Sequence, residues 1–83
     1  PVTFPPLPGY EGYARALDVG GVTPDQYAVI RSFLVRVNEL TPDARARIGA
    51  RLANAVATSM HHTPPAGVAP EAFLVSVAAA PKR

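Results

Sequence analysis

The triplet Thr-Pro-Asp occurs twice in this chain of 83 residues, at 23–25 and again at 41–43. A threonine just before a helix accepts a hydrogen bond from a free backbone N–H of the first turn. Proline suits the first helical position, where its missing N–H costs nothing, and aspartate places negative charge at the positive end of the helix dipole. The repeat therefore predicts two successive helices that begin alike, and it implies no chemistry.

The first of these helices is predicted over about 24–38. In it Gln26 lies three residues after Thr23 and completes a capping box, which Ala44 cannot do in the second copy. Apolar residues recur at helical spacing and define one buried face. The members of this face are Tyr27, Ile30, Leu34 and Val37, widened by Phe33.

The second helix is predicted over about 42–60, after a link short enough to leave the two helices antiparallel or sharply crossed. Gly49 weakens it by roughly 1 kcal/mol relative to alanine, unless another backbone packs close there. Its apolar stripe is expected at every fourth residue, with alanines on either side. These positions are Ile48, Leu52, Val56 and Met60, flanked by Ala44 and Ala55.

Two shorter helices are predicted at 11–17 and 70–80. Tyr10, Tyr13 and Leu17 would pack the first, and Phe73, Leu74 and Val77 would pack the second, which Ala69 caps poorly. We expect the short helices to form a lid, because two long helices alone cannot cover both apolar stripes. The predicted fold is all-α, a small bundle of three to four helices with a proline-rich extended N-terminal arm at 1–10 and a single domain at 11–83.

Few residues are suited to catalysis or metal binding. The chain has no cysteine, and neighbouring histidines on a helix diverge by about 100°, so His61 and His62 are better explained as a complement to the negative helix end. Its serines lie in predicted helices without a nucleophile-elbow pattern, and half of its six acids are explained by helix starts. We therefore expect no enzyme activity, no metal and no cofactor. The residues considered are Ser32, Ser59, Ser76, Asp25, Asp43 and Glu71.

Three arginines within seven residues, Arg45, Arg47 and Arg51, raise the alternative of a small helical DNA-binding module. Consecutive helices with a short link are typical of helix-turn-helix proteins. However, the start of the second helix offers few base-reading groups, and a net charge of +2 is far from a basic footprint. We expect no nucleic-acid partner and no small-molecule substrate.

Protein contacts are the function that the sequence favours, since 48% of so short a chain is hydrophobic. The arm favours a polyproline II conformation, which aromatic grooves recognise. A tether between domains, or a strap across the chain's own helices, is the alternative for this segment. We expect a protein partner or self-association through the arm and the edge of the arginine-bearing helix. The candidate contact residues are Phe4, Pro5, Pro6, Leu7, Pro8, Tyr10, Arg45 and Arg51.

Most of the chain also resembles a known family. The motif residues are Leu17-Asp18, Tyr27, Arg31, Phe33-Leu34, Leu40-Thr41-Pro42, Ala44-Arg45, Pro70 to Leu74, and Val77-Ala78. This pattern is similar to the tail that follows the membrane-embedded part of RDD-family proteins in actinobacteria.

The resemblance implies that the parent chain is an integral membrane protein with a role in transport or membrane stress responses. This segment would be its soluble C-terminal accessory domain on the cytoplasmic face of the membrane. A start at Pro1, without methionine, fits a processed terminus or a fragment of a longer protein. The family is named for an arginine and two aspartates in its membrane helices, and none of those positions maps onto this chain.

Overall fold

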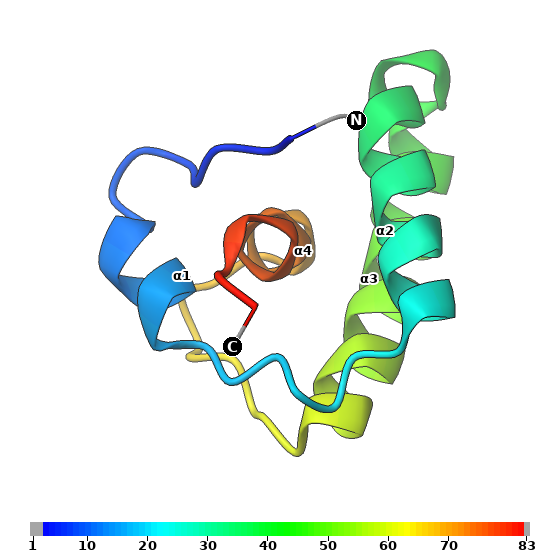
Figure 1. The fold of residues 1–83 in the computed structure, drawn as a ribbon. Coiled ribbons are helices and arrows are strands. Elements are labelled where there is room, and N and C mark those ends of the chain that lie inside the picture. Colours follow the sequence, from blue (N-terminus) through cyan, green and yellow to red (C-terminus); the bar gives the residue numbers. More distant parts are fainter. Residues whose placement is uncertain (1–2, 83) are drawn as a thin grey trace.

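The computed structural model describes residues 3–82, which form helices joined by loops and contain no strand (Figure 1). A 3-10 turn, η1, joins the second helix to the third, and the all-α prediction is confirmed. None of the helices in this range is long and apolar enough to cross a membrane. The helices are α1 (Glu11–Ala16), α2 (Pro24–Arg36), η1 (Val37–Glu39), α3 (Pro42–Met60) and α4 (Pro70–Ala79).

The two Thr-Pro-Asp triplets start α2 and α3 as predicted. Thr23 Oγ1 accepts a hydrogen bond from the Gln26 backbone at 3.1 Å, and Gln26 Oε1 accepts one from the Thr23 backbone at 3.0 Å, which completes the capping box. Thr41 Oγ1 accepts a bond from the Ala44 backbone at 3.2 Å without a reciprocal partner. Ala69 makes no side-chain cap on α4.

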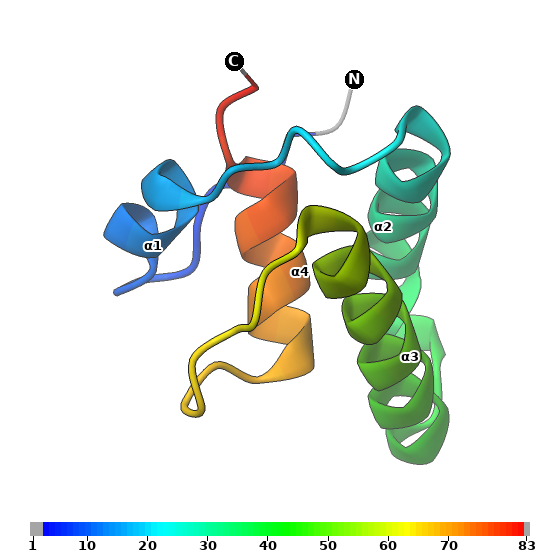
Figure 2. The same cartoon turned by 90° about the horizontal axis from the view of Figure 1, so that it is seen from below.

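The short helix α4 lies at the centre of the fold, and our expectation that it forms a lid is wrong. Figures 1 and 2 show α1 on one side of α4 and the pair α2 and α3 on the other. Phe73, Leu74 and Val77 are completely buried, because apolar residues surround this helix on nearly every side. A helix that is hydrophobic all round belongs in a core.

The buried face of α2 agrees with the sequence analysis. Ile30 is fully buried, Tyr27 and Phe33 are nearly so, and Leu34 packs at the edge of the core. Val37, predicted on the same face, is also nearly buried but lies in η1, because α2 ends at Arg36.

The buried face of α3 agrees with the prediction in its C-terminal half, where Val56 and Met60 are buried, and differs from it in the N-terminal half. Ile48 is 41% exposed and Ala55 is exposed, whereas Leu52 lies at the edge of the core. Small residues allow neighbouring helices to approach closely, so the first half of α3 presents Gly49 and Ala53 to the interior in place of Ile48 and Leu52. The buried residues are Gly49, Ala53, Val56, Ala57 and Met60.

The loop that enters α2 is held against the C-terminal end of α3. A Cβ at Gly21 would lie 2.2 Å from the carbonyl oxygen of Ser59, so only glycine fits there. Gln26 Nε2 donates a hydrogen bond to Ser59 Oγ at 2.9 Å. His61 then ends α3 in the left-handed conformation, with φ of 53°.

The arm crosses the chain's own helices. Its first two residues, Pro1 and Val2, lie outside the described part of the chain. From Thr3 the arm runs extended past α4 to α1 (Figure 1), and Phe4 borders a hollow together with Tyr27 and Ala78. Of the two alternatives for this segment, a strap over the fold agrees with the structure.

Candidate interaction surface

The proline-rich arm presents only part of itself to solvent. Leu7 is 37% exposed, and Pro5 and Pro8 are also exposed. Phe4, Pro6 and Tyr10 are half-buried, and the Tyr10 ring meets Tyr13 edge-on with a centroid separation of 6.4 Å. Half of the candidate contact residues in this segment therefore serve the chain's own packing.

Arg45 is engaged within the fold. Its Nε donates to Glu71 Oε2 at 2.8 Å and its Nη2 to Glu71 Oε1 at 2.5 Å. This bidentate bond joins the first turn of α3 to the first turn of α4. The hydrogen bond from Arg45 lowers the pKa of Glu71, and the same bond raises the pKa of Arg45. Arg51, the second arginine predicted to contact a partner, remains exposed.

A shallow groove between α2 and α3 was not predicted from the sequence. Its hollow has a volume of about 230 Å³. Val29 at one edge is 52% exposed and Ile48 at the other is 41% exposed, while Phe33 below them is nearly buried. The lining residues are Val29, Ser32, Phe33, Arg36, Leu40 and Ile48.

The outer face of α2 carries opposite charges at its two ends. Asp25, Val29, Ser32 and Arg36 follow one another at spacings of four, three and four residues and are all exposed. Residues at these spacings share one face of a helix. Within residues 3–82, Asp25 and Arg36 have no ion-pair partner. The outer face of α2 therefore has a negative charge at its start and a positive charge at its end, with a valine and a serine between them.

A signal for this surface was present in the sequence. Val29 and Val35 lie off the predicted buried face of α2, and Val35 is 57% exposed. The position of Ile48 could not be found in this way, because its spacing with Leu52 and Val56 suggested a common buried face.

His62 belongs to an aromatic cluster with Tyr13 and Phe73. Tyr13 Oη lies 2.8 Å from His62 Nε2, and the His62 ring stacks on Phe73 with a centroid separation of 5.8 Å. Among the described residues, no group of three or more potential ligands could hold a metal ion. The cluster attaches α1 and the loop after α3 to the central helix.

The serines considered for catalysis have structural partners or lie at the surface. Ser76 Oγ is fully buried and donates to the Ala72 carbonyl at 2.9 Å, and Ser59 bonds to Gln26. Ser32 lines the groove between α2 and α3. Within residues 3–82, no histidine forms a hydrogen bond with any of these three serines.

The fold and surface define a small all-α domain with an apolar groove on its outer side. Compared with known proteins, the chain matches no family model, no curated protein and no solved structure.

Proposed function

We propose that this chain is a non-catalytic interaction domain that pairs with a second copy of itself through the outer face of α2 and the adjoining groove. In the parent protein it would act as an accessory that brings two chains together. The observation that carries this proposal is the order of residues on α2, with an unpaired acid at one end, an unpaired base at the other and exposed valine between them.

The charges suit an antiparallel pair of α2 helices. Asp25 and Arg36 are eleven residues apart, which corresponds to about 16 Å along a helix. In a twofold pair each contact occurs twice, so Asp25 of each copy would face Arg36 of the other. The same register sets Val29 against Ser32 of the second copy, beside the groove.

The groove suits a protein side chain better than a small molecule. Its volume of about 230 Å³ is below the roughly 300–1,000 Å³ typical of small-molecule sites. Val29 and Ile48 would lose their exposure on pairing, and complete burial of such a side chain contributes about 1.5–3 kcal/mol. Each copy would thus cover the exposed apolar residues of the other.

The pairing is expected to be weak. One helix face offers less than the roughly 1,200–2,000 Å² that stable complexes bury. We therefore expect a dissociation constant in the micromolar range or weaker, so that the domain dimerises mainly when its parent is concentrated.

Sedimentation over a range of concentrations tests this proposal. Asp25→Arg and Arg36→Asp should each make the domain monomeric, because each places like charges together at both ends of the interface. A mixture of the two variants should form a heterodimer, since every facing pair is then opposite in charge. Arg47→Asp, an exposed change on α3, is the control and should leave dimerisation unchanged.

Two results would refute the proposed pairing. One is a wild-type domain that remains monomeric at every concentration. The other is dimerisation that neither single charge reversal weakens, which would place the interface elsewhere, for example on the exposed part of the arm around Leu7.

The parentage in an RDD-family membrane protein rests on the sequence resemblance alone. Hydrophobic spans upstream of Pro1 in the full-length product would support it, and a parent without such spans would remove both the membrane context and the cytoplasmic face from the proposal. The pairing of the domain with itself would be unaffected.

A DNA-binding module is the second candidate, and one observation favours it. The exposed face of α3 carries a row of polar side chains, namely Arg47, Arg51, Asn54 and Thr58, at helical spacing. Titration with duplex DNA at low and high salt separates the two functions, because binding through phosphate contacts weakens steeply as salt rises. Tight salt-dependent binding of DNA by the monomer would favour this candidate over self-association.

A further inference from the structure

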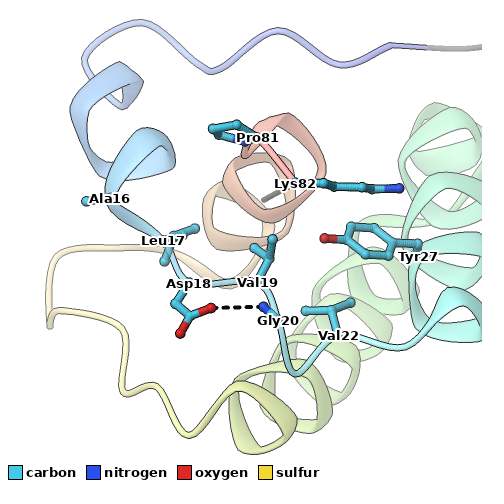
Figure 3. Close-up of a pocket in the computed structure, with 9 residues that line it drawn as sticks. All are labelled: Ala16, Leu17, Asp18, Val19, Gly20, Val22, Tyr27, Pro81 and Lys82. Carbon is cyan, nitrogen blue, oxygen red and sulfur yellow. Dashed lines mark hydrogen bonds between the residues drawn. The ribbon is translucent and has the colours of Figure 1, made fainter.

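A second hollow lies on the other side of α2, next to the segment that leads into it (Figure 3). Its volume of about 510 Å³ is within the range typical of small-molecule sites. Three buried side chains, Leu17, Val19 and Val22, supply apolar surface. Asp18, Tyr27 and Lys82 supply the polar groups.

The hydroxyl of Tyr27 is buried and has no hydrogen-bond partner among the described residues. Tyr27 as a whole is only 9% exposed, and Figure 3 shows its hydroxyl pointing away from α2 toward the other lining residues. Buried polar groups almost always have a partner, because leaving one unpaired costs the full desolvation of the group. Burial also raises the pKa of Tyr27, so the hydroxyl keeps its proton and can donate.

A positive charge lies over the ring that carries this donor, toward the end nearest α2 (Figure 3). Lys82 Nζ is 4.3 Å from the centre of the Tyr27 ring, and Lys82 has no carboxylate partner within residues 3–82. A hydroxyl donor and an ammonium group together favour an anionic acceptor.

Asp18 limits the charge of such a ligand. Its Oδ1 accepts a hydrogen bond from the Gly20 backbone at 3.0 Å, and it lies across the hollow from Lys82 (Figure 3). A second negative group on the ligand would be repelled by the Asp18 carboxylate, which would weaken binding.

We propose that the hollow binds a small monocarboxylate with an apolar body. The carboxylate accepts from the Tyr27 hydroxyl and pairs with Lys82, and the body lies on Leu17, Val19 and Val22. In the unliganded fold the Tyr27 hydroxyl is inaccessible to solvent, so the exposed side chain of Lys82, which lies over the Tyr27 ring, moves aside before the carboxylate reaches the hydroxyl. This site was not expected from the sequence, and it does not depend on the proposed self-association.

Titration followed by amide chemical shifts tests the site with three probes that share one ring. Phenylacetate should shift the amides of 17–22 and saturate with a dissociation constant of about 1 mM or tighter. Phenylmalonate, which carries a second carboxylate, and benzyl alcohol, which has no charge, should each bind at least about tenfold more weakly. Equal binding of all three probes would overturn the assigned chemistry, and no saturable shift with any of them would overturn the site.

Removal of single groups gives a second, independent test. Tyr27→Phe should weaken phenylacetate binding at least about fivefold and leave the thermal unfolding midpoint unchanged or higher, because the hydroxyl has no partner in the unliganded fold. Lys82→Gln should also weaken binding, and Tyr10→Phe, which removes a hydroxyl outside the hollow, should change neither quantity. Undiminished binding by Tyr27→Phe, or a lower midpoint for it, would overturn the role of this hydroxyl.

Discussion

The ring of Phe33 on α2 packs against Gly49 on α3, where an added Cβ would lie 3.3 Å from Phe33 Cζ and 3.8 Å from Cε2. The sequence analysis treated Gly49 as a weak point unless another backbone packs close to it. The structure places an aromatic side chain there instead, and the absence of a side chain on Gly49 lets α2 approach α3.

Gly49→Ala is expected to stabilise the domain slightly. Alanine gains up to about 1 kcal/mol of helix propensity over glycine. The new methyl group requires the Phe33 ring to move by a few tenths of an ångström, and the ring can do so because it borders the open groove between α2 and α3. Chemical denaturation should show a midpoint that is unchanged or higher. A clear loss of stability would mean that the ring is fixed in place.

Gly21→Ala is expected to have the opposite effect. The added Cβ would lie 2.2 Å from the Ser59 carbonyl oxygen and 3.2 Å from Met60 Cα, and a backbone cannot turn aside as a side chain can. The loop must move away from the end of α3, at a cost of about 2 kcal/mol or more. Chemical denaturation of Gly21→Ala and of Gly67→Ala measures this effect. Gly67→Ala is the control, because a Cβ at Gly67 meets nothing within 4 Å. Equal midpoints for the two variants would show that the loop does not pack closely on α3.

The helices could be predicted because their signals are local. Thr23 and Thr41 cap the helices they precede through bonds to the next turn, and these bonds depend only on neighbouring residues. The apolar face of α2 follows from spacing alone for the same reason.

The central place of α4 and the buried face of the first half of α3 depend on contacts between distant residues. Val56 and Met60 are buried as predicted, but in the first half of α3 the close approach of Phe33 to Gly49 places small residues on the buried face instead of Ile48. The pair Arg45 and Glu71 could not be predicted, because each residue had a sufficient local explanation as a surface charge or a helix start. The unpaired hydroxyl of Tyr27 likewise has no sequence signature.

Loss of the cap should cost more at α2 than at α3. Thr41→Ala removes one hydrogen bond and should lower stability by about 1 kcal/mol. Thr23→Ala removes the bond of a reciprocal capping box, and it also loosens Gln26, which reaches Ser59 on α3. We therefore expect the larger loss for Thr23→Ala when both variants are unfolded with urea. Thr23→Ser keeps the hydroxyl and serves as the control. A larger loss for Thr41→Ala would mean that the reciprocal bonds of Gln26 add nothing to the cap.

The pair Arg45 and Glu71 should make the domain sensitive to acid. The hydrogen bond from Arg45 lowers the pKa of Glu71 below its ordinary value of 4.5, so the fold favours the ionised carboxylate. This contribution to stability is complete above pH 4.5 and is lost as the pH falls through the lower pKa of the folded state. Glu71→Gln should therefore reduce stability near neutral pH and flatten its dependence on pH in the acid range.

Unfolding of wild type, Glu71→Gln and Glu39→Gln at a series of pH values measures this contribution. Glu39 is an exposed acid at the end of η1 and has no ion-pair partner among residues 3–82, which makes Glu39→Gln the matched control. The effect should be modest, since both partners of the pair are about one-third exposed and solvent screens their interaction. If Glu71→Gln and Glu39→Gln follow the same curve at every pH, the bond between α3 and α4 makes no net contribution to stability.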